Sequence, residues 1–205
     1  MNRKLSLPLL FSALAMFLAT SAGAEVHHFT VDAAHSQVGF KVRHLVAKTP
    51  GRFNDFAGAV WMDPENIEGT LKIEGTVQTA SINTDNEKRD GHLKSADFFD
   101  VENHPEMTLV SKKVKKKGDS YQVLFDLTIR GTTQEVPMTV DVAGVMTNPF
   151  TSTPTTGIEV TGKVNRKEFG MVWNKALDAG GFVLGDDVHI EIQLEATAMP
   201  DEAQS

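Results

Sequence analysis

The chain contains no cysteine among its 205 residues. Without cysteine it has no disulfide bonds, so apolar burial and hydrogen bonds must hold the fold together even in an oxidising compartment. The same absence excludes a thiol nucleophile and every metal site built from thiolates. The G-x-S-x-G motif of serine hydrolases is also missing, and Gly118-Asp119-Ser120 lies beside a lysine run that indicates the tip of a hairpin.

The chain also has fewer basic than acidic residues. The sequence has 20 Lys and Arg residues against 27 Asp and Glu residues, which gives a formal net charge of −7 at pH 7. An acidic surface of this kind disfavours nucleic acid and anionic lipid headgroups as partners. The one dense basic run, at 112–117, ends at the turn signal Gly118-Asp119 and indicates a solvated hairpin tip.

Long apolar runs are confined to the start of the chain. Two basic residues precede an apolar stretch at 5–19, and Ala22-Gly23-Ala24 follows it, which is the pattern of a cleavable signal peptide. The stretch falls short of the ~20 apolar residues that span a bilayer, and an uncleaved membrane anchor is the alternative. We therefore expect a signal peptide at 1–24 cleaved after Ala24, a periplasmic location, no stable membrane anchor, and a single domain over residues 25–205.

Helical periodicity is scarce in the remainder, where apolar and polar residues alternate with a period of two. Such runs lie at 38–42, 71–77, 121–129, 136–142, 158–164 and 188–194. Strict alternation is typical of antiparallel strands with one apolar and one wet face. The exception is the polar stretch ending at Phe99, where apolar residues spaced by three predict one short helical segment near 85–99, and Gly91 disfavours a long helix.

The sequence predicts about eight strands and almost no helix, so there are no helices to bury the apolar face of the sheet. Such a sheet must pack on a second sheet or close on itself. Closure of about eight strands gives a lumen that side chains fill or that holds one small ligand. From periodicity alone the fold class is all-β, and a sandwich, a filled barrel and a ligand-holding barrel all remain open.

Seven histidines invite a metal or acid–base hypothesis, but their spacing does not support one. They occupy positions 27, 28, 35, 44, 92, 104 and 189, with no H-E-x-x-H motif, so we expect no metal site and surface or rim positions for most of them. His44 differs because it continues the inward series Val38, Phe40 and Val42. It is either a satisfied core histidine or a polar group at one end of an apolar lumen.

Aromatic residues gather in irregular segments where strands would end. These are Phe53, Phe56, Phe98, Phe99, Phe150, Phe169, Trp173 and Phe182. Apolar groups at strand ends either plug a barrel or form the mouth of an apolar pocket, and spacing alone does not decide between the two.

Four motifs in order across residues 25–198 resemble the YceI-like family. They are Asp32-x-x-His35-Ser36-x-Val38-x-Phe40-x-Val42-x-His44 with Gly51-x-Phe53; Arg89-Asp90-x-His92-Leu93-x-Ser95-x-Asp97-Phe98-Phe99; Leu127-Thr128-Ile129-x-Gly131-Thr132-Thr133; and Asn165-Arg166-x-x-Phe169-Gly170 with Gly185-Asp186-x-Val188-x-Ile190. The resemblance implies an antiparallel, lipocalin-like β-barrel in the periplasm. It also implies a polyisoprenoid or similar long-chain amphiphile as the ligand, held in the lumen without a cofactor and without an established catalytic activity.

On this basis we predict a set of ligand-binding residues. We expect Phe40, Val42, Phe125 and Leu127 along the lumen, Phe53, Phe56, Phe98, Phe99, Phe169 and Trp173 near the rim, and His44 at the ligand's headgroup. Two alternatives are a periplasmic enzyme that acts on a lipid-like substrate with His44 or His92 as base, and a ligand-free barrel that serves as a stress-response interaction module. A homodimer is compatible with each of these functions.

Overall fold

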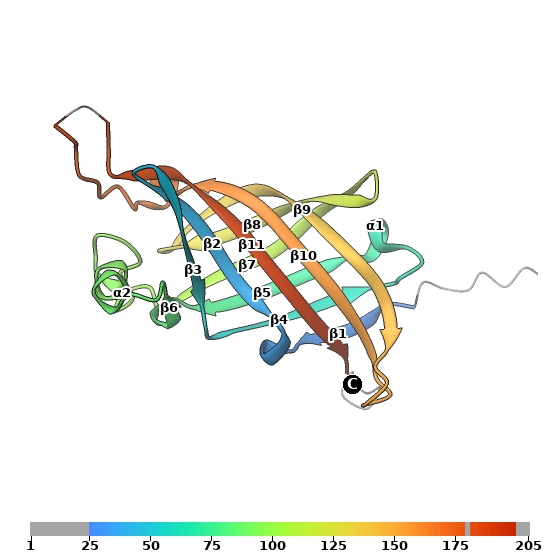
Figure 1. The fold of residues 1–205 in the computed structure, drawn as a ribbon. Coiled ribbons are helices and arrows are strands. Elements are labelled where there is room, and N and C mark those ends of the chain that lie inside the picture. Colours follow the sequence, from blue (N-terminus) through green and yellow to red (C-terminus); the bar gives the residue numbers. More distant parts are fainter. Residues whose placement is uncertain (1–24, 179–180, 200–205) are drawn as a thin grey trace, which may run out of the picture.

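The computed structural model describes residues 25–178 and 181–199. The leader expected at 1–24 therefore lies outside the described residues. The described chain is built almost entirely of antiparallel strands (Figure 1). None of its helices has the length and apolar character that crossing a membrane requires.

The elements follow one another with short connections. In chain order they are β1 (His27–Val31), η1 (Ala33–His35), β2 (Gln37–His44), β3 (Ala47–Phe53), β4 (Phe56–Met62), α1 (Ile67–Thr70), β5 (Lys72–Gln78), η2 (Thr79–Ser81), β6 (Ile82–Asn83), α2 (Glu87–Lys94), β7 (Glu106–Lys117), β8 (Ser120–Ile129), β9 (Thr132–Thr147), β10 (Pro154–Asn165), η3 (Arg166–Phe169) and β11 (Leu184–Ala198).

Three pairs of short strands behave as single bent strands. β1 leads into β2, β3 into β4, and β5 into β6, and the partners match across the bends: β1 pairs with β4, β2 with β3, and β3 with β6. With these pairs and β7 to β11 the chain makes an eight-stranded meander. β11 pairs with both β2 and β1, which closes the sheet into a barrel. The predicted all-β, antiparallel, lipocalin-like barrel of about eight strands is confirmed, and the sandwich is excluded.

The predicted helical segment is also present, as α2. Asn86 caps its start by accepting a hydrogen bond of 3.0 Å from the Arg89 amide, and Glu87 and Asp90 lie in the first turn, where acidic side chains favour a helix. The helix ends at Lys94, well short of Phe99. Gly91 lies within it and has open space around its Cα, so no packing opposes the glycine there.

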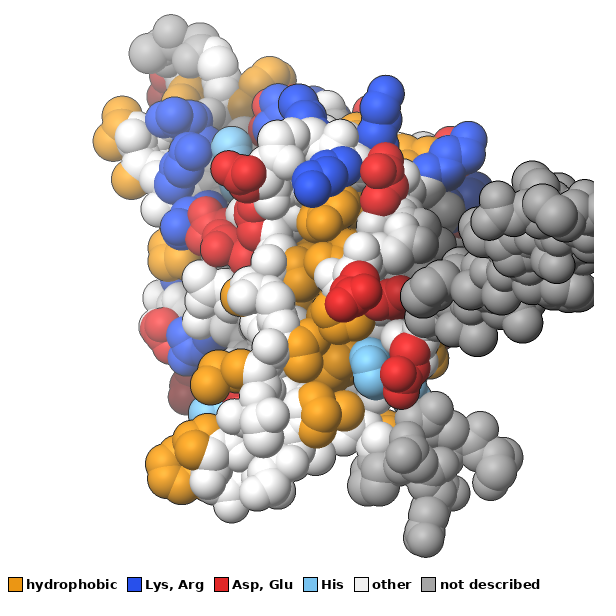
Figure 2. Space-filling model, turned by 90° about the vertical axis from the view of Figure 1, so that its right-hand side faces the viewer, with side chains coloured by type: hydrophobic (Ala, Val, Ile, Leu, Met, Phe, Trp, Pro, Cys, Tyr) orange, Lys and Arg blue, Asp and Glu red, His pale blue; other side chains and the backbone are white. Residues whose placement is uncertain are grey.

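The barrel is packed solid in one half. At the end where β8 begins and β11 ends, large side chains with almost no exposed surface fill the interior. They include Phe29, Val60, Met62, Val123, Phe125, Val140 and Val160. Figure 2 views the molecule from this closed end and shows apolar side chains along its centre with charged groups around them. The opposite half is not filled in this way, and that half holds the candidate site.

Candidate functional site

The unfilled half of the barrel contains a cavity of about 600 Å³, within the range typical of small-molecule sites. The strands β2, β3, β7, β8 and β11 supply most of its wall, and α2 lies over its opening. The apolar part of the wall comprises Val38, Phe40, Val42, Phe53, Val77, Leu93, Phe98, Phe99, Met107, Leu109, Leu127, Ile129, Met138, Val164, Met171, Trp173, Val183, Leu184, Val188, Ile190 and Ile192.

Two glycines allow large side chains to lie close against the strands that line the cavity. Phe40 lies so close to Gly51 on the neighbouring β3 that a Cβ there would collide with its ring. Met138 occupies the equivalent space beside Gly162, where a Cβ would lie 2.7 Å from the Met138 Cγ. Because these spaces are filled by Phe40 and Met138, a side chain at either glycine would push the cavity wall inward.

The mouth of the cavity is covered by α2 and by the loop that follows η3. We call this loop (residues 170–178 and 181–183) the mouth loop. Trp173 of the mouth loop lies edge-on to His92 of α2, with ring centroids 4.8 Å apart, and Phe98 lies 5.5 Å from Trp173. The His92 Nε2 also lies 2.9 Å from the Asp97 carboxylate. Two segments distant in sequence therefore meet across the opening through aromatic contacts.

Beneath the mouth loop lies a buried guanidinium. The Arg166 side chain is only 3% exposed, and it donates to the carbonyls of Gly185, Met171 and Trp173 and, at 3.1 Å, to the Asp186 carboxylate. Burial lowers the pKa of Arg166, and Asp186 opposes that shift. Since the pKa of an arginine lies far above neutral pH, the group stays charged and ties the mouth loop to the first residues of β11.

The polar part of the cavity wall is weighted toward positive charge. Lys88 and Arg89 of α2, together with Arg166, His44 and His92, line the cavity. Among the described residues the wall includes no aspartate or glutamate. In a chain whose formal net charge is −7, this leaves an apolar interior with a mouth suited to a neutral or anionic polar group.

Eight of the eleven residues predicted to bind ligand line this cavity. They are Phe40, Val42, His44, Phe53, Phe98, Phe99, Leu127 and Trp173. The structure brings together, around one cavity, strand residues and the aromatic residues of the segment after α2 and of the mouth loop. Contact with a ligand stays a prediction for all of them.

The other three residues are not among those that line the cavity. Phe125 belongs to the fully packed half, because β8 runs from the closed end toward the mouth and residues before Leu127 lie too deep. Phe169 ends η3 and is 1% exposed within the core. Phe56 begins β4 beside the bend after β3 and is half-buried outside the cavity lining. None of the three lines the cavity, and their predicted contact with a ligand stays untested.

The contribution of α2 and the depth of the cavity were not predicted from the sequence. Lys88, Arg89 and Leu93 of the helix line the mouth, whereas the rim residues predicted in this segment were Phe98 and Phe99, which follow the helix. The polar face of α2 gave no signal of its own, because a charged helix is usually solvated. Met138 and Ile192 lie on inward-facing positions of their strands, so the alternation identified their face but not their place along the barrel axis.

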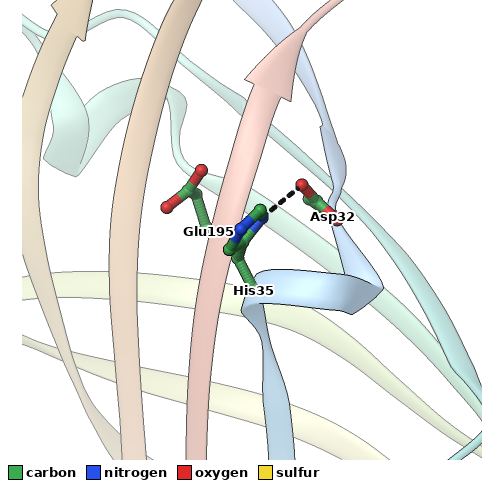
Figure 3. A group of neighbouring side chains, drawn as sticks. All are labelled: Asp32, His35 and Glu195. Atoms are coloured by element: carbon green, nitrogen blue, oxygen red, sulfur yellow. Dashed lines mark hydrogen bonds and ion pairs between the residues drawn. The ribbon is translucent and has the colours of Figure 1, made fainter. Parts of the chain in front are cut away.

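A second group of side chains lies outside the cavity, at the bend between β1 and β2. His35 Nδ1 lies 2.8 Å from the Asp32 carboxylate, and Glu195 of β11 lies on the other side of the imidazole (Figure 3). Asp32 also accepts a hydrogen bond of 2.9 Å from the Ala34 amide and so caps η1. These bonds give the group a structural role, since they fix the turn that joins the two halves of the first bent strand.

A closed eight-stranded antiparallel barrel with an apolar cavity at one end defines a lipocalin-like protein. The chain belongs to the YceI-like family, whose domain model matches residues 29–196. A UPF0312 protein of Staphylococcus aureus (strain USA300) is 43% identical over 82% of this chain and 96% of its own length.

Solved structures show the same architecture. BcnA of Burkholderia cenocepacia superposes with a TM-score of 0.71 at 26% identity, over 82% of this chain and 99% of BcnA. A domain from Saccharophagus degradans described as polyisoprenoid-binding has a TM-score of 0.61 at 13% identity, over 85% of this chain and 100% of that domain. At that identity the second likeness concerns the fold alone.

Proposed function

We propose that the protein is a periplasmic binding protein that carries a polyisoprenoid or similar long-chain lipid in its barrel cavity. The observation that carries this proposal is the cavity itself, which is apolar along its wall, closed by packed core at one end and covered at the other by α2 and the mouth loop. The polyisoprenoid-binding description of the Saccharophagus degradans domain supports the choice of ligand class.

The energetics of burial favour a long apolar tail. Each CH₂ group removed from water contributes roughly 0.8 kcal/mol, so several enclosed groups outweigh the losses of association and tail ordering. The tail needs no directional contact with the wall, whereas the headgroup at the mouth meets His44, Lys88 and Arg89. The expected leader at 1–24 supports the periplasmic location, where an insoluble lipid needs a carrier between membranes.

The proposal is tested by native mass spectrometry of protein recovered from the periplasm, followed by extraction of the bound material into organic solvent. We expect a one-to-one adduct whose mass fits repeating five-carbon units. A mass that stays that of the bare protein after incubation with quinones, polyprenyl phosphates and fatty amides would contradict a carrier function and favour an interaction module.

A pair of neighbouring substitutions localises the ligand. Ile190→Trp places a large ring in the cavity and should reduce the adduct. Glu191→Trp adds the same ring at the next residue of β11, whose side chain pairs with Lys41 outside the cavity at 2.7 Å. Equal loss of adduct in both variants would show that the lipid binds elsewhere.

The enzyme alternative is favoured by one observation, the pairing of His92 with Asp97 at the mouth. A carboxylate that orients an imidazole is part of general-base machinery. The same ring also lies against Phe98 and Trp173, which gives it a packing role. Conversion of an extracted or added lipid by the wild type, abolished in His92→Gln with lipid binding retained, would establish catalysis.

A further inference from the structure

The mouth end of the barrel carries a group of exposed apolar side chains that the cavity does not use. They lie in the β2–β3 turn and the mouth loop, which we call together the docking tip (residues 43–48, 170–178 and 181–183). The most exposed are Val46 at 93%, Val172 at 66% and Phe182 at 63%, and Leu45 and Leu177 add to them. Apolar side chains gathered at one end of a soluble barrel mark an interaction surface.

The two segments of the docking tip are joined to each other. The Leu45 amide donates to the Val183 carbonyl at 2.8 Å, and Val183 in turn donates to Lys175 at 3.0 Å. A bridge between Ala176 and Phe182 folds the mouth loop back on itself. In Figure 1 the mouth loop extends beyond the barrel wall at the upper left, next to the β2–β3 turn. The exposed residues therefore share one projecting surface.

The β2–β3 turn has an unusual composition for its shape. Leu45 has a φ of +52°, a left-handed conformation that glycine or asparagine adopts readily and leucine does not. Only Leu45 and Val46 separate β2 from β3. An apolar, branched pair at such a tip serves neither the turn nor solubility, which points to contact with an apolar phase.

Charge at the docking tip differs from that of the whole chain. Arg43, Lys48 and Lys175 are exposed beside the apolar residues, and Asp178 is the acidic residue among the described residues of the tip. The chain as a whole carries a formal net charge of −7. The bulk composition predicts repulsion from anionic headgroups, but the local excess of cations favours approach with this end forward.

We propose that the docking tip inserts reversibly into the surface of a bilayer that contains anionic lipid. Leu45, Val46 and Phe182 would enter the boundary between headgroups and acyl chains while the flanking cations contact lipid phosphates. Trp173, Val183 and Leu184 belong to or adjoin the mouth loop and also line the cavity. Docking by this end therefore turns the cavity mouth toward the membrane, where an insoluble ligand enters or leaves without crossing water.

The test is co-sedimentation of protein recovered from the periplasm with two kinds of vesicle, phosphatidylcholine alone and a 7:3 mixture of phosphatidylcholine and phosphatidylglycerol. The wild type should sediment with the mixed vesicles, less with the neutral ones, and less at high salt. Val46→Asp should lower the partition coefficient about tenfold, because an apolar contact is lost and a charge opposes insertion. Arg43→Gln with Lys48→Gln should remove the preference for the anionic vesicles.

The matched control is Phe150→Asp. Phe150 is 94% exposed in the connection between β9 and β10, at the opposite end of the barrel. The Phe150→Asp substitution introduces the same charge at an equally exposed apolar residue, and sedimentation with the vesicles should not change. Circular dichroism and thermal unfolding confirm that each variant is folded.

Absence of sedimentation of the wild type with the anionic vesicles would overturn the proposal. Equal losses in Val46→Asp and Phe150→Asp would overturn it as well, because the contact would then not belong to the docking tip. The measurement reports attachment to vesicles and needs no added cavity ligand, so its outcome does not depend on the proposed carrier function. Conversely, Val46→Asp should still retain the lipid adduct in native mass spectrometry, since Val46 lies outside the cavity wall.

Discussion

His92 of α2 and Trp173 of the mouth loop meet edge to face across the opening of the cavity, with their ring centroids 4.8 Å apart. This contact joins α2, which follows β6, to the mouth loop, which lies between η3 and β11. In the proposed carrier function a bound lipid leaves the cavity past these two segments. The contact would then hold the mouth closed, and its strength should set how fast the ligand exchanges.

Removal of this contact should accelerate release. An aromatic pair contributes about 0.5–1.5 kcal/mol beyond its buried area, so Trp173→Ala should raise the dissociation rate of a fluorescent polyprenyl lipid roughly three- to tenfold. The rate is measured by stopped-flow mixing with excess unlabelled lipid. Trp61→Ala is the control, because Trp61 stacks on His28 at the closed end of the barrel. An unchanged rate in Trp173→Ala would show that the contact does not limit exit.

Phe125 and Leu127 are two residues apart on β8 and face the same side of the sheet. Replacing each by alanine should nevertheless lower the free energy of unfolding by different amounts. Phe125 is fully buried in the packed half, so Phe125→Ala should lower the free energy of unfolding by about 3–5 kcal/mol. Leu127 borders an existing cavity and already lacks neighbours on one side. Leu127→Ala should therefore lower the free energy of unfolding by only about 1–3 kcal/mol.

Urea unfolding of both variants gives the comparison. Binding should show the reverse order, with Leu127→Ala altering lipid affinity and a folded Phe125→Ala protein retaining it. If Leu127→Ala proved as damaging to stability as Phe125→Ala, the division of the barrel into a filled and an open half would be wrong.

The same pair of residues shows what the sequence could predict. Alternation assigns each strand residue to the inner or outer face, and with few helices it also implies closure. It does not say how far along the barrel axis a residue lies, which depends on stagger between strands and on the bends near residues 32–36 and 54–55. Leu127 and Phe125 differ by about 7 Å along the strand, enough to separate cavity wall from packed core.

Contacts between segments distant in sequence were beyond prediction for a different reason. The contact of His92 with Trp173 and the four acceptors around Arg166 depend on how α2 and the mouth loop fold over the barrel end. Neither segment has a regular hydrophobic period from which to derive its position. The family motifs included His92 and Arg166, but the resemblance assigned Arg166 no role.

The Asp32–His35 pair should make stability depend on pH. Its hydrogen bond raises the pKa of His35 above 6.5 and, with the Ala34 amide, lowers the pKa of Asp32 below 3.8. The His35 contribution is fully present below pH 6.5 and is lost as pH rises through the elevated pKa; that of Asp32 is lost as pH falls through the depressed one. The pair therefore stabilises the fold most at mildly acidic pH.

Thermal unfolding of the wild type and His35→Gln between pH 5 and 9 measures this dependence. The wild type should have the higher midpoint near pH 5–6, and the difference should shrink above the elevated pKa of His35. A difference that stays constant over this range would show that packing of the imidazole, rather than its charge, holds the bend between β1 and β2.

Among the charged residues of the barrel, Arg166 should be the one whose substitution lowers the free energy of unfolding most. Its guanidinium supplies donors to three carbonyls and to Asp186, and the side chain is only 3% exposed. Arg166→Met removes the charge and keeps an apolar stem, but it leaves those carbonyls unpaired and should lower the free energy of unfolding by about 3–5 kcal/mol. Lys167→Met is the control, because Lys167 contacts the same Asp186 from an exposed position and should change stability by about 1 kcal/mol or less.

Hydrogen exchange of the backbone amides shows which segments of Arg166→Met lose stability. In Arg166→Met the amides of the mouth loop should exchange faster than in the wild type, while those of β8 and β9 at the closed end keep their protection. The mouth loop would lose its anchor before the packed half loses its core, since stability is not uniform across the barrel. Uniform loss of protection over all strands would instead assign Arg166 to the global core and remove its specific role in positioning the mouth.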